Sequence, residues 1–104
     1  MKEQYLYQLK LRPSLLDEAN WTERENDIVS EHFHMLQELC EQGKVMLAGR
    51  TLNLDDSGFG IVILEVDSEE EAKDIMKSDP AVKHGVMTAT LFPYRVALLR
   101  ESKR

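Results

Sequence analysis

The imidazole of His32 is the group in this sequence best suited to chemistry. Imidazole gains and loses a proton near neutral pH, so a histidine that faces a pocket can act as a general acid or base. His32 lies in a segment whose apolar residues recur at intervals of three and four, which predicts a helix. At about 100° per residue, His32 falls on the same helical face as Leu36, whereas His34 points to solvent. A histidine on an apolar face can also be a structural residue, and the sequence leaves both interpretations open.

Asp79 stands out among the acidic residues because it directly precedes Pro80. Aspartate before proline is typical of a helix start, where the carboxylate caps the first turn and proline takes the first helical position. Capping alone therefore explains the residue type. One carboxylate oxygen can still cap the helix while the other faces a pocket, so the two roles do not exclude each other.

Three further residues are candidate contacts for a substrate. Arg12 ends the first predicted strand and Arg50 ends the second. A guanidinium can hold an anionic group through two parallel hydrogen bonds. Tyr7, with Tyr5, is expected to line the space between two sheets, where one hydroxyl would reach a pocket. The competing interpretations are surface or ion-paired arginines and tyrosines that pack in the core.

The sequence indicates neither a metal nor a cofactor. Cys40 is the only cysteine, so an internal disulfide and a cysteine-based zinc site are excluded. His32 and His34 diverge on a helix and so do not form a chelating pair. No glycine-rich phosphate-binding loop is visible. Cys40 falls on the predicted apolar helix face, and we expect it to be a buried filler.

Length and charge narrow the class of protein. The 104 residues are typical of one domain, expected to span 1–104. The formal net charge of -6 argues against a general nucleic-acid binder and against attachment to an anionic membrane surface. No signal-peptide pattern or membrane-spanning apolar run is visible, which predicts a cytoplasmic protein.

The elements that must position these residues follow the order strand, helix, strand, strand, helix, strand. Strands are predicted at 5–11, 44–49, 59–66 and 86–99. Capping boxes at Thr22 and Ser68 begin the two main helices, the first of which ends at Gly43. Its predicted apolar face consists of Val29, Phe33, Leu36, Leu39 and Cys40.

This order predicts an α+β fold of the ferredoxin-like β-α-β-β-α-β type, with an antiparallel sheet and both helices on one face. A short helix is expected after Asp79, and Pro93 in the last strand indicates an edge position or a bulge. Segments 45–48 and 61–64 are apolar without the alternation expected of a solvated sheet face. A second copy of the chain is the simplest cover for that face, so we expect a homodimer.

Several short motifs, in this order and spacing, resemble the YciI-like (YCII-related) family. They are His32 with a glycine eleven residues later and a strand ending in Ala48-Gly49, the segment 68–72, Asp79-Pro80 with Gly85 five residues on, and Phe92-Pro93. The resemblance covers roughly residues 4–98. It implies a dimeric α+β barrel built from ferredoxin-like halves. It also implies an active site of one histidine and one aspartate, at positions that match His32 and Asp79.

The resemblance makes a histidine–aspartate pair the leading hypothesis for function. His32 would be a general acid/base, and the Asp79 carboxylate would orient its ring. The implied chemistry is cofactor-free isomerisation, elimination or dechlorination of a small cyclic or aromatic compound. One relative dechlorinates hydroxylated aromatic rings, muconolactone isomerases share the barrel architecture, and most members have no assigned reaction. The alternatives are a non-catalytic ligand-binding or sensing dimer and a cofactor-free monooxygenase of the related barrels.

Three positions depart from the family pattern. Val29 stands where the family often has arginine, Arg50 where proline usually follows Ala-Gly, and Ala81 where an aromatic residue usually follows Asp-Pro. The pocket wall and its charges are therefore expected to differ from those of relatives, and no relative's substrate transfers directly.

Overall fold

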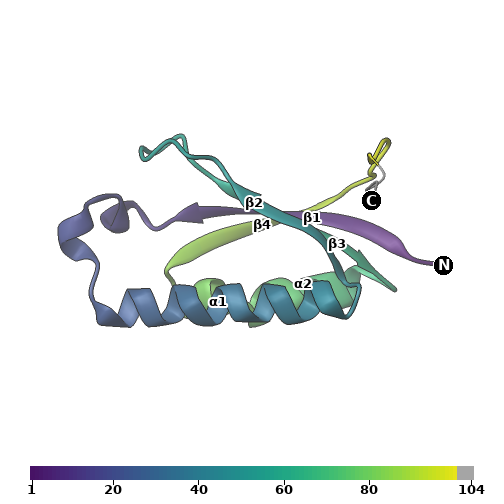
Figure 1. Cartoon of the computed structure of the whole chain (residues 1–104), viewed down its shortest axis with the longest axis horizontal. Coiled ribbons are helices and arrows are strands. Elements are labelled where there is room, and N and C mark those ends of the chain that lie inside the picture. The colour runs from purple at the N-terminus through teal and green to yellow at the C-terminus, as the bar shows by residue number, and fades with distance from the viewer. Residues whose placement is uncertain (101–104) are drawn as a thin grey trace.

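The computed structural model describes residues 1–100, in which a four-stranded antiparallel sheet is covered on one side by helices (Figure 1). The strands are β1 (Glu3–Leu11), β2 (Val45–Arg50), β3 (Gly60–Val66) and β4 (Met87–Pro93), arranged in the order β2-β3-β1-β4. The helices are α1 (Glu23–Glu41), α2 (Glu69–Ser78) and the short α3 (Pro80–Lys83). This arrangement confirms the predicted ferredoxin-like α+β fold.

Two details of the chain path differ from expectation. The segment between β1 and α1 contains two short 3₁₀ helices, Pro13–Leu16 and Glu18–Asn20. β4 ends at Pro93 rather than at residue 99, and one more hydrogen bond, from the Tyr94 N–H to the Gln4 carbonyl at 3.1 Å, follows its last paired residue. β4 is an edge strand, as its proline predicted. Within residues 1–100, no helix is both long and apolar enough to span a membrane.

The two main helices begin where their capping residues predicted. At the start of α1, Glu25 Oε1 accepts hydrogen bonds from the Thr22 N–H at 2.9 Å and from the Thr22 hydroxyl. At the start of α2, Ser68 Oγ accepts from the Glu71 N–H at 3.1 Å. The Glu71 carboxylate accepts from the Asp67 N–H at 3.0 Å rather than from Ser68, so this second box is shifted by one residue.

The core lies between the helices and one face of the sheet. Alternate residues of β1 point into it, as the two-residue period of a strand requires. The buried residues of this core are Tyr5, Tyr7, Leu9, Leu36, Val45, Val62, Leu64, Val66, Ala72 and Ile75. Both tyrosines thus face the helices, and the expectation that they line a space between two sheets was wrong. Alternation shows that two residues share a face but does not show which face the helices cover.

The buried face of α1 is rotated from the predicted one. Its buried and half-buried side chains, including Ile28, Met35 and Leu36, centre on the direction of His32. At about 100° per residue, Cys40 lies about 80° from that centre and Phe33 about 100°. Cys40 is accordingly exposed and Phe33 is 61% exposed, so both were wrongly assigned to the core.

The second face of the sheet has no helix over it, yet it carries an apolar row. In this row Leu47 lies opposite Ile63, Ile63 opposite Leu6, and Leu6 opposite Phe92, one residue from each strand. Leu47 is 45% exposed and Phe92 44% exposed. The β2–β3 connection and the segment after β4 both rise on this side of the sheet (Figure 1). We call the four residues Leu6, Leu47, Ile63 and Phe92 the open-face row.

Candidate active site

Asp79 occupies the junction of α2 and α3 and is completely buried. Its Oδ1 accepts a hydrogen bond from the Ala81 N–H at 3.0 Å, so the predicted N-cap of α3 is present. Burial of an acidic side chain is costly unless its oxygens find donors. The remaining partners of this carboxylate therefore decide what the residue does.

His32 supplies the second donor to Asp79. Its Nδ1 lies 2.6 Å from Asp79 Oδ1, although 47 residues separate the two in the chain. The His32 side chain is 13% exposed. An ionised carboxylate only accepts hydrogen bonds, so Nδ1 carries the hydrogen and Nε2 is left for other contacts. Every buried side-chain nitrogen or oxygen among residues 1–100 has a hydrogen-bond partner. Because Nε2 bonds to no residue in this range, it is not buried, and solvent reaches it.

Tyr7 supplies the third donor, and sequence reasoning missed this contact. Its hydroxyl donates to Asp79 Oδ2 at 2.9 Å, and the Tyr7 side chain is completely buried. Burial, reinforced by the nearby negative charge of Asp79, raises the pKa of Tyr7 above its usual range. The hydroxyl is thus a donor to the carboxylate and faces Asp79 rather than an open pocket. Three elements, β1, α1 and α3, meet at one carboxylate.

The two arginines predicted to hold a substrate are not bonded to the His32–Asp79 pair. Arg12 is exposed, and its Nε donates to Ser14 Oγ at 3.0 Å. Its Nη1 lies beside Gly85, 3.9 Å from the point where a Cβ at that position would be. Arg50 is exposed at the end of edge strand β2. In the described part of the chain, neither forms a hydrogen bond or ion pair with His32 or Asp79.

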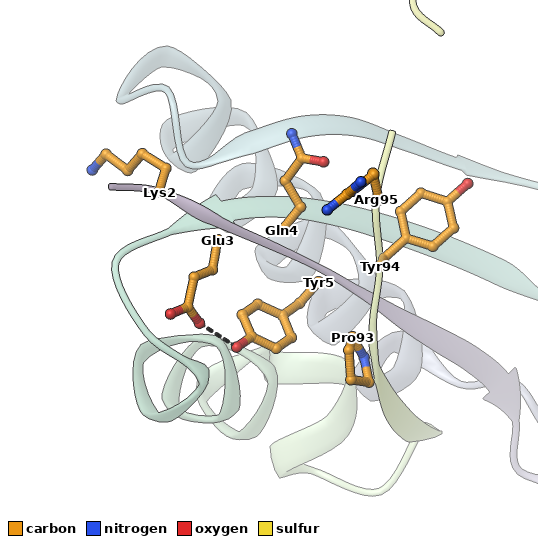
Figure 2. Close-up of a pocket in the computed structure, with 7 residues that line it drawn as sticks. All are labelled: Lys2, Glu3, Gln4, Tyr5, Pro93, Tyr94 and Arg95. Carbon is orange, nitrogen blue, oxygen red and sulfur yellow. Dashed lines mark hydrogen bonds between the residues drawn. The ribbon is translucent and has the colours of Figure 1, made fainter. Parts of the chain in front are cut away.

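A shallow depression of about 330 Å³ lies at the opposite end of β1 from Arg12. Its lining residues are Lys2, Glu3, Gln4, Tyr5, Pro93, Tyr94 and Arg95. Figure 2 shows Tyr5 bonded to Glu3 on one side, with Gln4 and Tyr94 on the other. This hydrogen bond raises the pKa of Tyr5 to about 12. The depression includes neither His32 nor Asp79, so it is separate from the candidate site.

The histidines of α1 point in different directions, as the helical period predicted. His32 is largely buried, whereas His34 is exposed. No group of three or more histidine, cysteine, aspartate or glutamate side chains is placed to hold a metal ion within residues 1–100. The hydrogen bonds to Asp79 define the candidate site as a histidine, a carboxylate and a tyrosine hydroxyl.

Comparison with known proteins identifies the family of the chain. The YCII-related domain profile matches residues 4–93. The chain belongs to this family. A solved structure of 5-chloro-2-hydroxyhydroquinone dehydrochlorinase from Burkholderia phenoliruptrix AC1100, in complex with 2,5-dihydroxybenzoquinone, has a TM-score of 0.66 and 23% identity, covering 88% of this chain and 93% of that one. An uncharacterized protein from Thermotoga maritima has a TM-score of 0.59 and 10% identity, covering 91% and 100%. No curated protein sequence matches the chain.

The two motif glycines of this YCII-related domain have a physical explanation. Gly43, eleven residues after His32, has φ +82°, and Gly85, five residues after Pro80, has φ +75°. Both lie in the left-handed region where other residues are strained, and both stop a helix. They set where α1 and α3 end, and these two helices carry His32 and its partner Asp79.

Proposed function

We propose that the protein is a cofactor-free enzyme that moves protons on a small cyclic or aromatic compound. His32 is the general acid/base and Asp79 orients it. The observation that supports this proposal is the 2.6 Å contact between a completely buried carboxylate and a histidine that solvent still reaches. A general base must be both oriented and accessible to the proton that it takes.

The proposed chemistry runs through Nε2 of His32. With Nδ1–H bonded to Asp79, the lone pair of Nε2 accepts a proton from an acidic C–H or O–H group of the substrate, and Asp79 stabilises the resulting imidazolium. In an isomerisation the imidazolium of His32 returns that proton to a second carbon atom of the substrate. In an elimination the electrons of the broken C–H or O–H bond form a new double bond in the substrate, and chloride leaves with the electrons of the C–Cl bond. The proton stays on the imidazole until solvent takes it. Proton transfer of this kind contributes about 10²- to 10⁴-fold in rate.

The dehydrochlorinase relative suggests which compounds to test first. That protein acts on a chlorinated hydroxyhydroquinone, and its structure contains a dihydroxybenzoquinone. At 23% identity the likeness establishes a shared fold, and the residues of this chain must decide the substrate. We therefore propose hydroxylated six-membered rings as the first class, followed by lactones and small organic acids.

The experiment compares two matched variants, His32→Asn and His34→Asn. Asparagine at 32 keeps an N–H donor near the position of Nδ1 but has no group at Nε2. The variant can therefore keep the hydrogen bond to Asp79 while it loses the proposed proton acceptor. The compounds are first screened by thermal shift on the wild-type protein, since a ligand at 100 times its Kd stabilises by about 2.7 kcal/mol. Compounds that bind are then tested for turnover by ring absorbance and chloride release.

We expect His32→Asn to melt close to the wild type and to lose turnover by about 10²- to 10⁴-fold. The exposed His34→Asn variant should behave as the wild type. Turnover that survives in His32→Asn would overturn the proposal. A compound that binds both proteins equally and is never converted would favour the alternative, a ligand-binding module that uses the same surface.

We also propose that the chain forms a homodimer through the open-face row. A single chain leaves Leu47 and Phe92, on the two edge strands of this sheet face, almost half exposed. Exposed leucines on the two segments that rise beside this face, Leu52, Leu54, Leu98 and Leu99, extend the apolar surface. A second copy packed sheet against sheet would cover the open-face row, and an exposed apolar sheet face of this kind is typical of an interface.

Phe92→Lys tests the dimer, with Phe33→Lys as a control of the same chemistry on the helix side. Covering the 44% of Phe92 that is exposed is worth about 1 kcal/mol per copy, hence about 2 kcal/mol for a symmetric pair, or roughly 30-fold in Kd. Sedimentation velocity at micromolar concentration should show a dimer for the wild type and Phe33→Lys, and dissociation for Phe92→Lys. A monomeric wild type, or a dimer that only Phe33→Lys disrupts, contradicts this interface.

A further inference from the structure

We infer that Tyr7 is a positioning residue whose hydroxyl holds the Asp79 carboxylate so that His32 stays in its Nδ1–H tautomer. This inference rests on the proposed function and assigns to Tyr7 a role other than substrate contact. Tyr7 touches the second carboxylate oxygen, Oδ2, at 2.9 Å, while the capping N–H and the imidazole share Oδ1.

The donors around Asp79 are unevenly divided. Oδ1 accepts from Ala81 N–H at 3.0 Å and lies 2.6 Å from His32 Nδ1. Within residues 1–100, Tyr7 is the one protein donor to Oδ2. Both side chains are completely buried, so bulk water cannot replace the hydroxyl. Loss of this donor leaves a buried carboxylate oxygen unsatisfied, which is among the costlier states of a polar group.

The Tyr7 hydroxyl restricts the terminal side-chain torsion of Asp79, which packing alone does not fix. The terminal torsion of an aspartate side chain is broad and roughly two-fold, so contacts to one oxygen do not determine where the carboxylate plane lies. Tyr7 belongs to β1, which is hydrogen-bonded on both sides by β3 and β4. A donor on this central strand ties Oδ2 to the sheet, and Oδ1 then stays directed at α1.

Tyr5 provides a comparison within the same strand. It lies two residues away on the same face and in the same core, but its hydroxyl donates to Glu3 and not to an acidic group of the candidate site. A buried tyrosine ring in this core therefore does not require Asp79 as partner. Tyr5→Phe removes the same single atom as Tyr7→Phe without touching the carboxylate.

The test measures the tautomer of His32 in wild type, Tyr7→Phe and Tyr5→Phe by long-range ¹H–¹⁵N correlation spectra, at a pH where the ring is neutral. The nitrogen that carries hydrogen and the nitrogen that does not have well-separated ¹⁵N shifts. We expect the Nδ1–H form to dominate in wild type and Tyr5→Phe. In Tyr7→Phe the tautomer ratio should fall toward a mixture by up to about tenfold, the worth of the His32–Asp79 hydrogen bond that selects the Nδ1–H form.

A second measurement on the wild type does not depend on how the variant folds. The Tyr7 hydroxyl proton should be visible at low temperature as a downfield signal protected from exchange, because it is buried and bonded to a carboxylate. Unchanged His32 shifts in Tyr7→Phe, or no protected tyrosine hydroxyl in the wild type, would overturn the inference.

The outcomes also separate this inference from the proposed function. If Tyr7→Phe mixes the tautomers but His32→Asn keeps full turnover, the positioning is correct and the proposed chemistry is wrong. If the tautomer is unchanged while His32→Asn is inactive, the chemistry stands and Tyr7 serves packing. With an active compound, a positioning role also lowers kcat while KM stays near the wild-type value.

Discussion

Replacement of Asp79 by alanine tests whether this residue only caps α3 or also joins β1, α1 and α3. Asp17 is the matched control, because its Oδ1 accepts from the N–H two residues on, Ala19, at 2.9 Å, as Asp79 does from Ala81 at 3.0 Å. Asp17 is exposed and Asp79 is completely buried. The local capping bond is thus the same in both, and only the surroundings differ.

The expected cost of Asp79→Ala is the sum of three losses and one gain. The cap is worth about 1 kcal/mol, and the stranded Tyr7 hydroxyl costs about 1–3 kcal/mol because it is buried. The hydrogen bond to the largely buried His32 adds about 1 kcal/mol. Removal of a buried carboxylate also ends its desolvation cost, which offsets part of these losses. We expect a net destabilisation of about 3 kcal/mol, against about 1 kcal/mol or less for Asp17→Ala.

Urea unfolding followed by circular dichroism measures both values. A loss of about 3 kcal/mol lowers the midpoint by roughly 2 M at the slopes usual for small domains, and the variant remains folded. The Asp79→Ala, Tyr7→Phe double variant should show a coupling of at least about 1 kcal/mol, since each residue is the other's partner. Equal costs for Asp79→Ala and Asp17→Ala, with no coupling to Tyr7, would refute the reasoning and leave Asp79 a cap alone.

Two further predictions concern other parts of the chain. Hydrogen bonds from the Thr22 hydroxyl and N–H lower the pKa of Glu25 from 4.5 to about 2. The stability that these bonds provide is therefore complete above about pH 4.5 and is lost as pH falls toward about 2. Over this range the unfolding midpoint of Glu25→Gln should change less than that of the wild type. An equal change in both proteins would contradict the capping role. Cys40 is exposed, so it should react with a thiol reagent in native protein as fast as in urea-unfolded protein, whereas strong native protection would show a buried thiol.

The fold was largely predictable because its signals are local. Caps at Thr22 and Ser68, the stop at Gly43 and the break at Pro93 each act within a few residues. The burial pattern of α1 was predictable only in part. Five apolar residues spread over a wide arc, and the sheet and α3 decided that the side carrying Ile28 would be covered and the side carrying Phe33 would not.

The candidate site was predictable as residue types and not as contacts. His32 was recognised from its helical angle and Asp79 from the proline that follows it. Their contact spans 47 residues, and the bond between Tyr7 and Asp79 spans 72. Such contacts depend on how α3 is placed across the sheet, and no local pattern encodes that distance. The family resemblance supplied the histidine–aspartate pair, whereas Tyr7 was expected to contact a substrate or to pack in the core, and its bond to Asp79 was not predicted.

Asp79 and Asp17 also differ in what it costs to place their carboxylates. A carboxylate can cap a helix at the surface, as Asp17 does, where water solvates the oxygen that the cap leaves free. At Asp79 the second oxygen is buried and needs a tyrosine from the central strand, and the first is shared with a histidine. A buried charge of this kind seldom adds stability over an apolar alternative. The proposed function supplies a reason for the arrangement: a carboxylate bonded to Nδ1 of His32 leaves Nε2 in one protonation state for the proton transfer that we propose.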